Sequence, residues 1–185
     1  MLPNIFMYFA ASVMPAERVA SFLTATVGDF RFGAFDALFA AYALAYVPFG
    51  FRLVYSLVAL PQFAEPKTML NARAVVAEIK KTNWFVAACE ICYDNYQETV
   101  YFFVAAVLAG VQTGVDASVL SDFATMWLLM RVAYIFVTYA AAGKFVPVAV
   151  MRTPIFLTNI AVLAQMFMLA QAAYVATPVK KGLFG

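Results

Sequence analysis

The sequence contains no histidine, and this absence excludes a large part of enzyme and cofactor chemistry. No imidazole is available to act as a general base, to bind a metal ion or to ligate a haem or chlorophyll. Charged residues are scarce as well, at 12% of the chain, against about 25% in soluble domains. The net charge of +2 and the lack of a basic block or stripe argue against nucleic acid as a partner.

Cysteine is almost absent too, because the chain has only Cys89 and Cys92. Their C-x-x-C spacing is compatible with a redox pair or a metal site. Both residues fall in an apolar run next to Glu90, where cysteine commonly serves as a small apolar filler. We favour the filler interpretation and predict no metal site.

Apolar residues are what the chain has in abundance, at 65% with a mean hydropathy of +0.85. Four apolar segments are long enough to cross about 30 Å of hydrocarbon as helices. They cover residues 34–59, 83–109, 119–142 and 154–176. The sequence therefore predicts an all-α, multi-pass integral membrane protein with four membrane-crossing helices in one domain.

The regions outside these four segments have a different character. Residues 1–33 include "PAERVASFLTATVGDF", which is typical of an amphipathic helix and predicts an interfacial or embedded N-terminal arm. A cleaved leader is the alternative for this segment. Residues 177–185 form a short C-terminal tail, and residues 61–82 are the most polar connection. From about Thr68 this connection favours helix, so we expect the second span to start there and to project beyond the bilayer.

The distribution of Lys and Arg gives a weak orientation signal. It places the connections at 61–82 and 143–153 on the cytosolic, matrix or stromal side. An organelle inner membrane, the thylakoid and the endoplasmic reticulum all remain open as compartments.

Three carboxylates interrupt the second apolar segment. Glu90, Asp94 and Glu98 follow each other at intervals of four and share one face of a helix. Ionisable side chains in a membrane helix normally face a bundle interior and are paired. We therefore expect Arg131 of the third segment, or Arg52 or Arg152 near span ends, to pair with this stripe.

Three interpretations of the stripe stay open. Glu90, Asp94, Glu98 and Arg131 form a structural polar network in the interpretation that we favour. The alternatives are a small-molecule site and a proton path, and a location of Glu90 at the membrane interface would need no partner at all.

Two longer motifs resemble those of the MAPEG superfamily, the membrane-associated proteins of eicosanoid and glutathione metabolism. "YDNYQETVYFFVAAVLAG" supplies an Asn-x-x-Glu pair before an aromatic-rich apolar run. "RVAYIFVTYAAAGKFVPVAVMRTPIF" supplies an arginine, two tyrosines and a later arginine. The matching residues, over a likeness that covers 34–176, are Asn95, Glu98, Arg131, Tyr134, Tyr139 and Arg152.

The resemblance implies a left-handed four-helix bundle that forms homotrimers and binds glutathione between subunits. In that case Asn95, Glu98 and Tyr134 would bind the cofactor. Arg131, Tyr139 and Arg152 would be the catalytic residues, with Tyr139 or Arg152 stabilising the attacking thiolate.

The chain departs from the family pattern at the residues that would bind the anionic glutathione. Ile91 stands at the place of the motif's arginine and Tyr93 at that of its histidine or glutamine. Thr138 stands where the third-helix tyrosine is expected, and Tyr139 is one residue further. Asp94 adds a negative charge where an anionic tripeptide would lie. These departures predict a divergent member with a degraded glutathione motif.

Two functions follow from these residues. The first is a non-catalytic scaffold or accessory subunit without a cofactor, whose partners are membrane lipids and other membrane protein subunits. The alternative is a glutathione-dependent transferase, peroxidase or isomerase that acts on lipophilic substrates.

Overall fold

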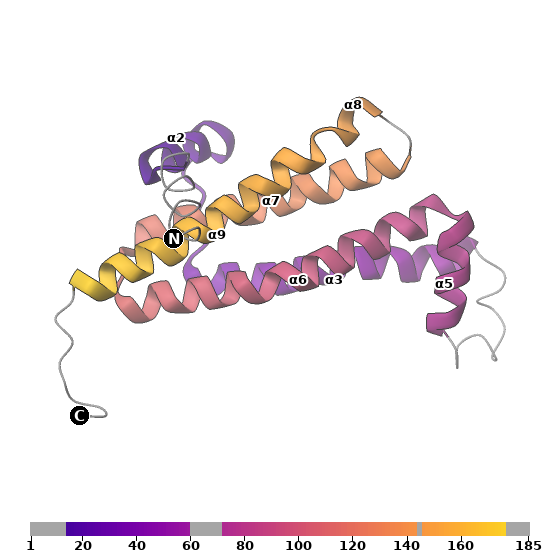
Figure 1. Ribbon diagram of the computed structural model, residues 1–185, viewed down its shortest axis with the longest axis horizontal. Coiled ribbons are helices and arrows are strands. Elements are labelled where there is room, and N and C mark those ends of the chain that lie inside the picture. Colours follow the sequence, from indigo (N-terminus) through magenta and orange to yellow (C-terminus); the bar gives the residue numbers. More distant parts are fainter. Residues whose placement is uncertain (1–13, 60–71, 144–145, 177–185) are drawn as a thin grey trace, which may run out of the picture. The chain divides into compact units, whose positions relative to one another are not determined.

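The computed structural model describes residues 14–59, 72–143 and 146–176, and its regular elements are all helices (Figure 1). This confirms the all-α class. The helices are, in chain order, α2 (Ala16–Val27), α3 (Ala34–Ala59), α5 (Ala72–Thr82), α6 (Trp84–Thr113), α7 (Ala117–Ala142), α8 (Val146–Ala149) and α9 (Arg152–Ala176). The predicted tail, the first residues of the predicted arm and the expected helix start near Thr68 lie outside the described residues.

Three of these helices, α3, α7 and α9, are long and apolar enough to cross a membrane. The expected segments 34–59, 119–142 and 154–176 correspond to them. The expected segment 83–109 corresponds to α6, which is longer still at 30 residues. Its first half is polar, because it carries Glu90, Asp94, Asn95, Gln97 and Glu98, and α6 is not among the three apolar spans.

Contacts within the chain divide it into two compact units, and each long helix contributes a part to both. In its described part, the first unit contains residues 14–40, 101–130 and 157–176. The second contains residues 41–59, 72–100, 131–143 and 146–156.

The first unit has an aromatic core and an anchored N-terminal helix. Trp127 of α7 stacks on Phe103 of α6, with ring centroids 4.0 Å apart. Leu23 of α2 is fully buried. Arg31, just after α2, forms an ion pair with Asp122 of α7 and donates a 2.7 Å hydrogen bond to the Gly28 carbonyl. Arg31 thus connects the end of α2 to α7.

In the second unit, α5 and α6 are separate helices, and α5 lies across the start of α6 (Figure 1). Asn83 stands between them, and its Oδ1 accepts hydrogen bonds from the backbone N–H groups of Phe85 at 3.0 Å and Val86 at 3.1 Å. This is N-cap geometry, which starts a new helix. The expectation that one continuous helix runs from the 61–82 connection into the span is therefore wrong, because Asn83 caps α6.

Candidate functional site

A buried arginine lies at the centre of the polar part of the second unit. Arg131 is only 1% exposed, and its Nη1 donates a 2.8 Å hydrogen bond to the Asn95 amide oxygen. Its guanidinium lies 5.6 Å from the Tyr96 ring centroid and 5.8 Å from that of Tyr134. The hydrogen bond to Asn95 and the two aromatic faces therefore help to hold the charge.

The second arginine of this region, Arg152, stands at the start of α9 and contacts the same tyrosine. Its Nε donates a 3.0 Å hydrogen bond to the Tyr134 hydroxyl, and its guanidinium lies 5.6 Å from the Tyr134 ring centroid. An open cavity of about 320 Å³ borders both residues. We call it the Arg152 cavity, and it is lined by Asn95, Tyr134, Arg152, Thr153 and Phe156.

Tyr139 belongs to a different cluster. Its hydroxyl lies 3.1 Å from the Cys89 sulfur, and its ring lies 5.4 Å from that of Phe85. Cys89 and Cys92 are both buried and free. The structure therefore brings Asn95, Arg131, Tyr134 and Arg152 together and directs Tyr139 toward the cysteines.

The carboxylates of α6 have three different environments. Glu90 is half-buried and forms an ion pair with Arg52 of α3, whereas Asp94 and Glu98 are exposed. Arg52 is one of the three arginines that were expected to pair with the stripe. The spread of environments follows from helix geometry, because a step of four residues turns the stripe by about 40° and carries it off the packed face.

Arg131 was one of the three arginines expected to pair with the stripe, and the structure shows it donating a hydrogen bond to Asn95. On α6 the two residues are three positions apart, so Glu98 points about 60° away from Asn95. Asn95 is half-buried and Glu98 is exposed. The amide side chain of Asn95 therefore lies next to the Arg131 guanidinium.

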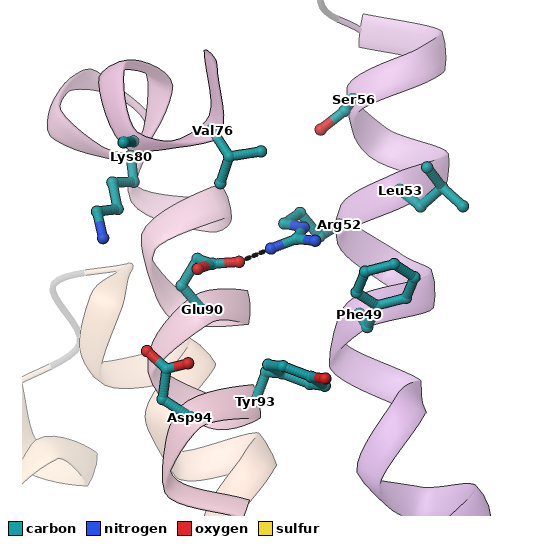
Figure 2. Close-up of a pocket in the computed structure, with 10 residues that line it drawn as sticks. Phe49, Arg52, Leu53, Ser56, Val76, Lys80, Glu90, Tyr93 and Asp94 are labelled. Atoms are coloured by element: carbon teal, nitrogen blue, oxygen red, sulfur yellow. Dashed lines mark ion pairs between the residues drawn. The ribbon is translucent and has the colours of Figure 1, made fainter. Parts of the chain in front are cut away.

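A second, larger cavity was not foreseen from the sequence (Figure 2). It measures about 590 Å³ and lies between α3, α5 and α6, and we call it the α3–α5–α6 cavity. Its lining is Phe49, Arg52, Leu53, Ser56, Val76, Ala77, Lys80, Glu90, Tyr93 and Asp94. No sequence motif predicts this cavity, because the cavity depends on the break at Asn83 that turns α5 across α6.

The described part of the chain contains no group of three His, Cys, Asp or Glu side chains that could hold a metal ion. The cationic groups beside the two cavities are arginines and a lysine, which bind anions rather than metals. The larger cavity carries charges of both signs, because Glu90 and Asp94 line it beside Arg52 and Lys80.

Comparison with known proteins gives a family but no individual relative. The model of the MAPEG family matches residues 39–174. No curated protein and no solved structure matches the chain.

Proposed function

Because the chain belongs to the MAPEG family, we propose that it is a non-catalytic membrane subunit that serves as a scaffold in a larger membrane assembly. The observation that carries the proposal is the hydrogen bond between Arg131 and Asn95, two of the residues by which the chain resembles glutathione-binding members. Here they bind each other in the protein interior. This supports a structural role for the retained polar residues.

The proposed architecture is a bundle of four membrane-crossing helices, with α6 as the fourth crossing. The first half of α6 carries Glu90 and Asp94 beside the α3–α5–α6 cavity and Asn95 beside the Arg152 cavity, an arrangement that a bundle tolerates and a lipid-facing helix does not. We further propose that α2, whose Val19 and Leu23 are buried, belongs to an N-terminal arm at the membrane interface. A homotrimer is one way in which such subunits could associate.

The electrostatics of the region favour a site without glutathione. Ile91, which takes the place of the family's arginine, is 40% exposed and offers only methyl and methylene groups. Asp94 is exposed in the same stretch and would repel an anionic ligand. Arg131 is bound to Asn95, and freeing it for a ligand would break a charge-assisted hydrogen bond.

The outward face of α3 favours a protein partner. Tyr42 and Tyr46 are 62% and 43% exposed, and their hydroxyls are 3.3 Å apart. They lie in the middle of a 26-residue apolar helix, whereas tyrosines in membrane helices gather at the interfaces. The two hydroxyls contact each other, and the exposed rings give a neighbouring helix a surface to pack against.

Photo-crosslinking tests this proposal. A benzophenone amino acid at Tyr42 should give one discrete crosslink to a different polypeptide in native membranes. The same probe at Phe136 of α7, which is 70% exposed, is the matched control and should give none. Crosslinks from position 42 only to lipid, or only to further copies of this chain, would contradict the hetero-complex.

The alternative function, a glutathione-dependent enzyme for lipophilic substrates, is favoured by one observation. The Arg152 cavity combines Asn95, Tyr134 and Arg152, which are a hydrogen-bonding amide, a phenol and a cation. In this alternative Arg152 would stabilise the thiolate, and Glu98, which is exposed, would hold the peptide's amine. Saturable glutathione binding that depends on Arg152 would favour it over the scaffold.

A further inference from the structure

The wall of the α3–α5–α6 cavity contains an ion pair and two further charged side chains, one positive and one negative. Arg52 and Glu90 neutralise each other across it (Figure 2). Lys80 of α5 and Asp94 of α6 also line it, and neither takes part in an ion pair among the described residues. The cavity thus presents one available cation and one available anion, with no net charge.

A buried hydroxyl adds a polar group to the same cavity. Ser56 is 2% exposed, and its Oγ has no hydrogen-bond partner within the described ranges. Figure 2 shows this oxygen directed from α3 toward the space between α3 and α6. A buried hydroxyl without a partner is costly, and a ligand's polar group would satisfy it.

The rest of the lining is apolar and continues to the outer face of a membrane helix. Phe49, Leu53 and Val76 contribute the apolar wall, and Leu53 is 46% exposed. α3 is one of the apolar spans and Leu53 lies about two turns beyond Tyr46, so we place this end of the helix against lipid and the proposed protein partner at the tyrosines. The cavity therefore borders the lipid phase and can admit the polar end of a molecule whose tails stay in the bilayer.

We propose that the α3–α5–α6 cavity binds the headgroup of a zwitterionic phospholipid, with the ammonium at Asp94 and the phosphate at Lys80. Arg52 is largely neutralised by Glu90, so the two available charges select a headgroup that carries both signs. An anionic headgroup would meet Asp94 and a purely cationic one would meet Lys80, and either like-charge contact disfavours binding. The volume lies within the range of about 300–1,000 Å³ typical of ligand sites. This proposal does not depend on whether the protein is a scaffold or an enzyme.

Native mass spectrometry of the full chain, released from nanodiscs of defined composition, tests the site. Nanodiscs with equal amounts of phosphatidylethanolamine and phosphatidylglycerol should yield protein that retains phosphatidylethanolamine in preference. Asp94→Asn should weaken this retention about tenfold, since a charge-assisted hydrogen bond contributes about 1.5–3 kcal/mol and 1.4 kcal/mol is a factor of ten. Lys80→Ala should weaken retention of both lipids, because both carry the phosphate.

The helix α5 supplies matched controls. Lys81 neighbours Lys80 but pairs with Glu78 at 2.7 Å and does not line the cavity. Lys81→Ala and Glu78→Gln should therefore leave lipid retention unchanged. Because Lys80 and Asp94 are themselves exposed, their substitution leaves the packing intact, and a loss of retention reports on the site.

Competition experiments separate the lipid from other zwitterions. Soluble glycerophosphoethanolamine shares the headgroup but has no tails, so it should displace the lipid only weakly. If this soluble headgroup or glutathione displaced the bound lipid as effectively as added lipid does, the assignment to a phospholipid would be overturned. Retention that is equal for both lipids, or that is unaffected by Asp94→Asn and Lys80→Ala, would overturn the site itself.

Discussion

Replacing Asn95 with leucine tests whether Arg131 is held as a structural element. Asn95→Leu keeps a side chain of similar size but removes the acceptor of the 2.8 Å hydrogen bond from Arg131. The guanidinium is 1% exposed, so water cannot easily take the place of the amide oxygen. We expect the variant to be clearly destabilised while Asn95→Asp, which keeps an acceptor, is tolerated.

The magnitude follows from the chemistry of the pair. Interhelical hydrogen bonds in membranes contribute about 0.6 kcal/mol on average and reach about 1.7 kcal/mol, and bonds to charged groups reach about 1.5–3 kcal/mol in soluble proteins. We expect a coupling energy of about 1.5 kcal/mol between Asn95 and Arg131. The single Asn95→Leu variant should lose about 2–3 kcal/mol, because it also leaves a buried charge with fewer partners.

A double-mutant cycle measures both quantities. Asn95→Leu, Arg131→Leu and the double variant would be unfolded reversibly in mixed micelles, followed by circular dichroism. The double variant should lose less stability than the sum of the two single variants, because removing both partners leaves no unmatched charge. Additive losses, or a single-variant loss below about 0.5 kcal/mol, would refute the structural role of the pair.

Three further predictions concern Arg31, Gly110 and Asp116 of the first unit. Arg31→Lys should speed proteolysis in α2 as much as Arg31→Ala does, because an ammonium cannot reproduce the fork of donors that serves Asp122 and the Gly28 carbonyl. Gly110→Val should lower the free energy of unfolding by about 1–3 kcal/mol through overpacking, since even a Cβ would lie 2.9 Å from Leu120, and thermal denaturation measures this loss. Hydrogen bonds from the Ser118 hydroxyl and from backbone N–H groups lower the pKa of Asp116. Asp116 therefore stabilises the fold above its unfolded-state pKa and loses this electrostatic effect as the pH falls through the folded-state pKa, so Asp116→Ala should lower the midpoint of thermal unfolding more at neutral pH than at strongly acidic pH.

Much of the helical framework could be predicted from composition and periodicity. The apolar runs at 34–59, 119–142 and 154–176 correspond to α3, α7 and α9 because a helix that crosses hydrocarbon needs about 20 apolar residues. The break before α6 could not be predicted in this way. It depends on whether Asn83 turns its side chain back onto two backbone N–H groups, and propensity along the chain favoured continuation.

The sequence showed which residues belong to the polar region more readily than it showed which of them contact each other. Arg52, Glu90, Asn95 and Arg131 were all recognisable as unusual in apolar segments. Which arginine meets which acceptor depends on the rotation of each helix, and the two four-residue steps from Glu90 to Glu98 already add up to about 80°. The α3–α5–α6 cavity was out of reach for the same reason, since Lys80 approaches it only because α5 turns across α6 (Figure 1).

Calorimetric titration of glutathione into the protein in nanodiscs tests the central claim most directly, with the wild-type chain beside an Ile91→Arg variant. Ile91 is partly exposed, so an arginine fits there without disturbing the packing and restores the family's anion-binding residue. We predict no saturable heat for the wild type and measurable binding for Ile91→Arg. Saturable binding to the wild-type chain that is lost in Arg152→Ala would contradict the claim that this member of the family is a non-catalytic subunit.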